Sequence, residues 1–170
     1  MRVPDFRKIA KIKREFWEKL GKKTVIWHKI NVQIDNRDAR SGRLFTLYTT
    51  RYAKDKKAGK AVKPGETQRS KQVIPPNLTL TGKMMDAFKF IRSSNTGFLY
   101  GITDPEEAKK MIGNQSKRKI GGRPRIVSNQ EYPLPRKVKE KVTTAIAGKI
   151  SQNLKDVFTA DGKVVRIIKV

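Results

Sequence analysis

The sequence has no cysteine in its 170 residues and a single histidine, His28. Without cysteine the chain cannot form disulfides, thiolate nucleophiles or cysteine-based zinc sites, although the compartment stays open. One histidine supplies no metal-binding cluster, and no Gly-x-Ser-x-Gly segment offers a nucleophile for a triad. We therefore interpret His28, beside Trp27 in a predicted strand, as a packed or solvated side chain rather than a catalytic one.

Long apolar runs are also missing. The longest, such as residues 25–27 and 98–100, have three members, far fewer than the roughly 20 needed to cross a bilayer. The N-terminus is charged, and no apolar stretch of the kind found in signal peptides follows it. These absences predict a chain with neither a membrane span nor a signal peptide.

Motifs for nucleotide chemistry are absent as well. The stretch NLTLTGKMMDAF contains Gly82-Lys83, but Asn77 stands where a Walker loop needs glycine, and Met84 where it needs serine or threonine. The backbone therefore cannot curl around phosphate, and no hydroxyl meets magnesium. A dinucleotide fingerprint is missing too. We expect no enzyme activity, no cofactor, no metal and no small-molecule substrate.

Acidic residues are scarce. Forty Lys and Arg stand against fifteen Asp and Glu, a net charge of +25, so the chain repels itself unless something anionic lies near it. Nucleic acid is the first candidate, and acidic surfaces of neighbouring proteins are the alternative. The length favours a single domain over residues 1–170, and the hydrophobic fraction of 36% predicts a modest core with protruding segments.

The first third of the chain predicts a helix followed by extended structure. Residues 1–23 form an expected N-terminal helical arm that starts at Pro4-Asp5 and stops at Gly21. Its apolar face packs on its own domain or on a neighbouring copy. Residues 24–34 are rich in β-branched and aromatic types and predict a strand or bent hairpin. The apolar face of the arm consists of Ile9, Ile12, Phe16 and Leu20.

A basic segment follows a turn-rich stretch. Leu44 to Tyr52 looks ordered, with Phe45, Tyr48 and Tyr52 spaced as one helical face. Residues 51–71 then hold eight basic and two acidic residues with scarcely an apolar anchor. Such a segment cannot bury enough surface to fix itself, so we expect an exposed basic loop over residues 53–75.

The stretch NLTLTGKMMDAF predicts a structural corner. Leu78 and Leu80 share one face of a short strand, Gly82 permits the turn, and Met84 re-enters the core, which leaves Lys83 as a surface charge. Next, alternating aromatics on either side of Ser-Ser-Asn-Thr-Gly predict a β-hairpin over residues 88–102.

Two helices are expected in the last third. Asp104 is placed to cap a short helix that Gly113 ends, with Glu106 and Glu107 in a structural role at its positive end. Ile126-Val127 predicts a short strand, and residues 163–170, KVVRIIKV, have the pattern of an edge strand. A helix of about five turns should begin near Pro135, because apolar residues recur every four positions. They are Val138, Val142, Ile146, Ile150 and Leu154.

Two basic clusters are candidates for facing DNA or a protein partner. Glycines among them would let backbone approach phosphates, but aromatic residues are not interleaved, so any binding to nucleic acid should be non-specific and dependent on salt. The clusters are Lys54, Lys56, Lys57 and Lys60, and Lys117, Arg118, Lys119, Arg123 and Arg125.

The order of these features resembles the tail-completion and head-tail joining proteins of tailed bacteriophages, a group of virion-morphogenesis and neck proteins. The resemblance covers roughly residues 40–160. The first 35 residues have no counterpart, and Ile126 stands where an aromatic is often found. The matching positions are Tyr48, Tyr52, Ala53 and Lys56; Leu78, Thr81, Gly82 and Met84; Gly101; Ala108; and Arg123 or Arg125.

The resemblance implies an α+β protein with a small antiparallel sheet packed against a long C-terminal helix, plus the N-terminal amphipathic helix and long basic loops. It also implies a homo-oligomeric ring in the virion neck or tail, made in the host cytoplasm, with portal, adaptor or tail proteins as partners and genomic DNA nearby. A non-specific nucleic-acid-binding protein of ribosomal or nucleoid type is the alternative. The five-turn helix and the lack of a known binding module count against that alternative.

Overall fold

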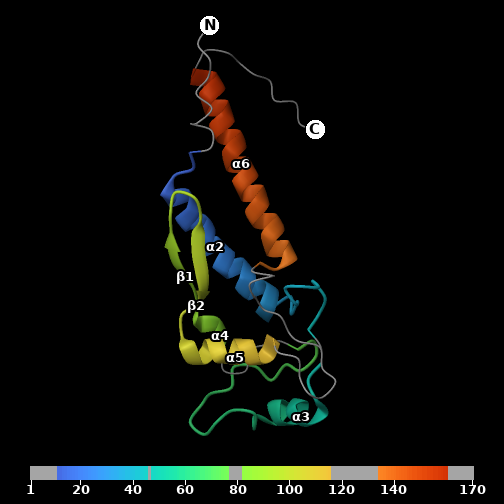
Figure 1. The fold of residues 1–170 in the computed structure, drawn as a ribbon. Helices are drawn as coiled ribbons and strands as arrows, with labels where there is room; N and C mark the ends of the chain where they lie inside the picture. The colour runs from blue at the N-terminus through green and yellow to red at the C-terminus, as the bar shows by residue number, and fades with distance from the viewer. Residues whose placement is uncertain (1–10, 46, 77–81, 116–133, 161–170) are drawn as a thin grey trace.

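The computed structural model describes residues 11–45, 47–76, 82–115 and 134–160, which form an α+β fold as predicted (Figure 1). An antiparallel two-stranded sheet packs on one helix, and a long C-terminal helix packs on the same helix. In chain order the elements are α2 (Arg14–Gln33), α3 (Thr50–Ala58), α4 (Lys83–Asp86), β1 (Phe88–Ser93), β2 (Phe98–Ile102), α5 (Pro105–Gln115) and α6 (Arg136–Ala160).

Helix α2 runs straight through the segment expected to be a strand. The predicted stop at Gly21 and the predicted strand over residues 24–34 are therefore wrong. The buried positions recur every three or four residues, which is the helical period, but several carry polar or small side chains. They are Trp17, Leu20, Gly21, Thr24, Val25, His28, Asn31 and Val32.

Polar residues are tolerated on this buried face because each of them finds a nearby partner. Thr24 donates its hydroxyl to the Leu20 carbonyl at 2.8 Å, and Asn31 donates its amide to the Arg37 carbonyl at 2.9 Å. Pairing within the same helix, or with the turn that follows it, removes most of the cost of burying these groups.

The predicted hairpin of β1 and β2 is confirmed. Phe88 pairs with Ile102 and Ser93 pairs with Phe98, and a bulge between Phe90 and Arg92 adds one residue to β1. The turn of the hairpin is seated on α2, because the Trp17 indole donates a hydrogen bond to the Asn95 carbonyl at 3.0 Å.

Helix α6 confirms the predicted long helix near Pro135, although its 25 residues exceed the predicted five turns, and it lies alongside α2 (Figure 1). Only the first part of its apolar stripe is fully covered: Val138 and Val142 are buried, whereas Ile150 is 37% exposed. At the start of α6, Lys137 forms an ion pair with Asp35 at 3.8 Å.

Two apolar clusters meet on α2. One joins α2 to α4 and the hairpin, with Val32, Met85 and Phe88 at its centre. The other joins α2 to α6 through Leu20 and Val138, with Phe98 of the hairpin packed against it. Because α2 contributes to both, it is the element that organises the described fold.

The predicted corner is confirmed in the part that the structure describes. Gly82 adopts φ 84°, a left-handed conformation that favours glycine, and directly precedes α4. Met84 and Met85 are buried, and Lys83 is exposed as expected. Leu78 and Leu80 lie outside the described residues.

Helix α5 has the predicted cap and a later end. The Asp104 carboxylate accepts hydrogen bonds from the backbone N–H groups of Glu106 and Glu107 at 2.9 and 3.1 Å. The helix continues past Gly113 to Gln115, so the predicted stop is wrong by two residues. Other predictions fall outside the described residues: the start of the arm at Pro4, the strand at residues 126–127 and the strand at residues 163–170.

Candidate polyanion-binding surface

The predicted exposed loop over residues 53–75 begins with helix α3, so this prediction is wrong in its first part. Thr49 caps the helix by accepting a hydrogen bond from the Tyr52 N–H at 3.4 Å. Gly59 ends the helix at φ 78°, and the Lys60 N–H reaches back to the Asp55 carbonyl at 2.8 Å. This is the arrangement of a Schellman motif, which satisfies the last carbonyls of the helix. Residues 60–76 form turns and irregular structure.

Lys56 does not face solvent, which corrects its assignment to the exposed cluster. Its side chain is fully buried. Nζ donates a hydrogen bond to the Tyr48 hydroxyl at 3.3 Å and lies 4.8 Å from the centre of the Tyr48 ring, a cation–π geometry. The rings of Tyr48 and Tyr52 are in contact, with centroids 4.9 Å apart. Lys56 therefore anchors α3 rather than presenting a charge.

Four cations of this segment are exposed, and we call them the α3 cationic face. Arg51, Lys54 and Lys57 recur every third residue, so they lie along one side of the helix, and Lys60 follows it. Asp55 is the one acidic residue in residues 49–60. Lys54, Lys57 and Lys60 were predicted to be exposed, whereas Arg51 was missed, although its spacing from Lys54 and Lys57 is visible in the sequence.

The segment after α3 is fastened back to the helix and to α4. The Gln68 amide donates to the Lys56 carbonyl at 2.6 Å and to the Ser70 carbonyl at 2.9 Å. An ion pair of 2.7 Å joins Arg69 to Asp86 of α4. These polar contacts tie the segment after α3 to both α3 and α4.

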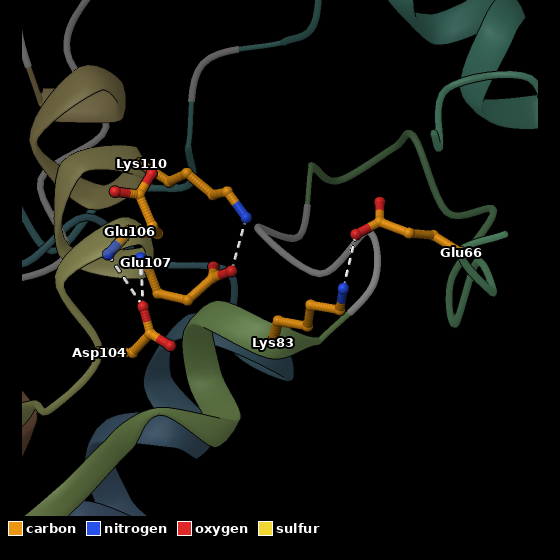
Figure 2. Close-up of polar contacts among 6 residues, drawn as sticks. All are labelled: Glu66, Lys83, Asp104, Glu106, Glu107 and Lys110. Atoms are coloured by element: carbon orange, nitrogen blue, oxygen red, sulfur yellow. Dashed lines mark hydrogen bonds and ion pairs between the residues drawn. The ribbon is translucent and has the colours of Figure 1, made fainter. Parts of the chain in front are cut away.

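A second ion pair joins the same segment to α4, close to the start of α5 (Figure 2). Lys83 Nζ lies 2.6 Å from Glu66 Oε1, and Lys110 Nζ lies 2.5 Å from Glu107 Oε1. The hydrogen bond from Lys83 lowers the pKa of the Glu66 carboxyl, with a smaller contribution from the Lys110 charge. The hydrogen bond to Glu107 raises the pKa of Lys110. Each of these two lysines is therefore paired with a carboxylate.

The second predicted basic cluster lies outside the described residues. Its members are Lys117, Arg118, Lys119, Arg123 and Arg125. The structure therefore brings together Lys54, Lys57 and Lys60 on one side of the molecule and leaves their relation to the second cluster as a prediction.

His28 is a packed side chain of α2, not of a strand. Its ring is fully buried, 4.6 Å from the Phe88 ring between centroids, and Nδ1 lies 3.1 Å from the Tyr100 hydroxyl. Burial raises the pKa of Tyr100, so this phenol stays protonated at neutral pH. In the part of the chain that the structure describes, no three His, Asp or Glu side chains gather as metal ligands do, and no helix could span a membrane.

Comparison of the chain with protein-family models, curated proteins and solved structures finds no match of any of the three kinds. The arrangement described here can attract a polyanion through the α3 cationic face, and nothing in that face reads a base sequence.

Proposed function

We propose that the protein is a structural virion protein of a tailed bacteriophage that forms a ring at the neck or head-tail junction around the DNA exit path. The proposal is supported by the contacts of the residues that carry the resemblance to neck and joining proteins. Tyr48, Tyr52 and Lys56 pack together, and Gly82 turns the chain so that Met84 enters the core. Each of these residues therefore has a packing role, as the proposed structural protein requires.

Exposed apolar side chains support contacts between copies. Ile26 of α2 and Ile34 at its C-cap are 57% and 69% exposed, and Ile30, which is half-buried, lies between them at the same four-residue spacing. We call these three residues the α2 outer stripe. Isolated exposed isoleucines are ordinary, whereas neighbouring apolar side chains that form one patch are typical of a surface that a partner covers. In a ring the heterologous neighbour is such a partner.

The α3 cationic face gives the excess charge a purpose in this proposal. Packaged DNA passing through a ring would meet lysine and arginine side chains that attract phosphate without regard to sequence. The same face would also suit acidic patches on a portal, adaptor or tail protein. Figure 1 places α3 at the opposite end of the molecule from the C-terminal end of α6. The α3 cationic face and the C-terminal part of α6 could therefore contact different partners.

Assembly is the direct test of the proposal. The purified protein, alone and mixed with capsids from particles that lack it, is to be examined by light scattering with size-exclusion chromatography and by negative-stain electron microscopy. We expect ring-shaped oligomers or a ring at the capsid vertex. A protein that stays monomeric in both settings and is missing from mature particles would exclude a neck or joining role.

A non-specific nucleic-acid-binding protein is the second candidate, favoured by the α3 cationic face itself. A mobility-shift assay over a salt series separates the two functions. A dedicated binder should hold DNA or RNA near physiological salt, with affinity falling by a log–log slope of about 0.9 for each phosphate neutralised. A ring protein should bind weakly or not at all under these conditions.

A matched pair of variants identifies the surface responsible. The first replaces Arg51, Lys54 and Lys57 by glutamine, and the second replaces Lys22, Lys109 and Arg136, which are exposed but ion-paired with acids. Both variants lose the same charge. Equal weakening by the two would show that net charge, rather than the α3 cationic face, governs binding.

A further inference from the structure

Helix α2 covers one face of the hairpin (Figure 1). Phe88, Phe90 and Tyr100 point toward this helix and pack in the apolar cluster around Val32 and Met85. Side chains alternate along a strand, so the neighbours of these residues lie on the opposite face. We call that face, together with the exposed residues at the bulge, the hairpin outer face. It consists of Lys89, Ile91, Arg92, Leu99 and Gly101.

The fold of the chain itself does not require glycine at position 101. The φ angle of Gly101 lies outside the left-handed region that favours glycine, and an added Cβ would meet no atom within 4 Å beyond its chain neighbours. Gly21 is different, because an added Cβ there would lie 2.7 Å from the Phe90 ring. Glycine inside a strand weakens the sheet and often marks a place that another molecule approaches closely. Gly101 therefore indicates a close approach from outside the chain.

Apolar side chains lie beside this glycine on the same face. Leu99 stands two residues before Gly101 on β2 and is 47% exposed, and Ile91 at the bulge of β1 is 46% exposed. Arg92, the residue after Ile91, pairs with Leu99 across the sheet. Single exposed apolar residues are ordinary, but neighbouring ones form a patch of the kind that a partner covers.

The charges on the hairpin outer face are all positive. Lys89 and Arg92 supply them, and residues 87–103 contain no acidic residue. The carboxylates at either end of this range are engaged elsewhere, because Asp86 forms an ion pair with the segment after α3 and Asp104 caps α5. A partner that matches this face therefore carries negative charge.

Three kinds of partner could bring negative charge, and the face favours one of them. The phosphate backbone of duplex DNA offers no apolar surface for Ile91 and Leu99. A second copy of this chain, with a net charge of +25, would mainly add positive charge. An acidic amphipathic helix of another protein supplies both carboxylates and apolar side chains, and helices commonly cover the faces of sheets.

We propose that the hairpin outer face binds an acidic amphipathic helix of another protein. Apolar side chains of that helix contact Ile91 and Leu99, and its backbone crosses the sheet over Gly101. Its carboxylates pair with Lys89 and Arg92. This contact requires neither DNA nor a second copy of the chain, so it goes beyond the proposed ring.

Photocrosslinking of the full-length protein, in the cells that naturally make it, tests which partner is bound. The photoreactive amino acid p-benzoylphenylalanine replaces Leu99 in one variant and Thr144, exposed on α6, in the control. We expect position 99, and not position 144, to give a product that mass spectrometry maps to an acidic amphipathic segment of another protein. Cross-links to DNA or to a second copy, equal products from both positions, or no product from position 99 would each overturn the proposal.

Titration with that segment, made as a synthetic peptide, tests the close approach at the glycine. Gly101→Ala should weaken binding at least tenfold in isothermal titration calorimetry without lowering the melting temperature, because the added methyl group meets the partner and not the chain itself. Gly148→Ala on α6 is the matched control, since an added Cβ there also meets nothing within 4 Å. Equal affinity of the two variants would refute the proposed contact.

The charges are tested with the same peptide. A double variant with Lys89→Gln and Arg92→Gln should bind more weakly and lose most of its dependence on salt, and an unchanged salt dependence would contradict the proposed pairing.

The outcome is separable from that of the ring. A protein that forms rings but gives no cross-link at position 99 would refute this contact alone, and a monomer that gives the cross-link would refute the ring alone.

Discussion

Helices α2 and α3 each turn one face inward, but the two faces are made of different chemistry. α2 buries Trp17, Leu20 and Val32 in two apolar clusters. α3 buries Lys56, whose ammonium lies over the ring of Tyr48, and the segment after α3 is held by ion pairs and amide hydrogen bonds. Apolar burial stabilises by about 25 cal/mol for each Å² removed from water, whereas exposed ion pairs contribute about 1 kcal/mol or less.

The difference indicates that the two regions have unequal stability. The core around α2 should unfold only with the whole molecule, while α3 and the segment after it should open at lower cost, as units held by polar contacts commonly do. The candidate functional surface lies on the less stable unit. Four changes test this contrast, in order of expected effect.

The largest effect should follow Phe88→Ala. Phe88 is 1% exposed and touches both His28 and Tyr100. Removing its ring leaves a cavity between α2 and the hairpin, with an expected loss of about 3 to 5 kcal/mol in the free energy of unfolding. Urea unfolding measures this loss, with Leu99→Ala as the control on the exposed side of the hairpin. Similar losses for both variants would contradict the division between core and surface.

Gly82→Val should have the next largest effect. Valine strongly disfavours the left-handed conformation at φ 84°, and its Cβ would lie 2.6 Å from Arg69 Nη1. Backbone strain of this kind costs about 1 to 3 kcal/mol, and the clash should also break the Arg69–Asp86 ion pair. Thermal unfolding and light scattering give the effects on folding and assembly. If neither changed, the corner would have no structural importance.

Lys56→Ala should release α3 without unfolding the core. The variant removes the cation–π contact and its packing, which together hold the unit by about 1 to 2 kcal/mol. Hydrogen exchange should accelerate in residues 50–58 and remain unchanged in α2, and Lys54→Ala serves as an exposed control. Faster exchange throughout the molecule would mean that the two regions unfold together.

The smallest effect concerns the Glu66–Lys83 ion pair, through pH. Since the pKa of Glu66 lies below its ordinary value of 4.5, the pair stabilises the fold above that value and its contribution is lost as pH falls through the lowered pKa. The melting temperatures of the natural protein and Glu66→Gln should therefore converge on acidification. A difference that stays constant between neutral and acidic pH would exclude this pair as the source.

Predictions from sequence succeeded where apolar residues follow one period. The hairpin alternates around a turn-forming stretch, and α6 repeats apolar residues every four positions, so both were predicted in place. α2 was missed because Gly21, Thr24 and His28 occupy buried positions while Ile26 is exposed. Counting apolar residues then hides the helical period, and a dense run of β-branched residues suggests a strand.

Lys56 was missed for a related reason. A lysine is expected in water, and only the nearby tyrosines reveal that its charge has a partner. A four-residue spacing links Tyr48, Tyr52 and Lys56, and on a helix it would predict that they touch. Tyr48 does contact both of the others, but it precedes the helix, so these contacts do not arise from helical spacing. The exposed cations near Lys56 were predicted because a lysine in a polar segment is usually solvated, and Lys54, Lys57 and Lys60 follow that rule.

Gly21 has a consequence for how the hairpin is mounted. An added Cβ there would come within 2.7 Å of the Phe90 ring and 3.0 Å of Phe98, so the missing side chain sets the depth at which both strands sit. A single methyl group at this position would push the two phenylalanine rings, and with them the hairpin, away from α2. Gly21, which the sequence suggested as the end of a helix, therefore sets the distance between α2 and the hairpin.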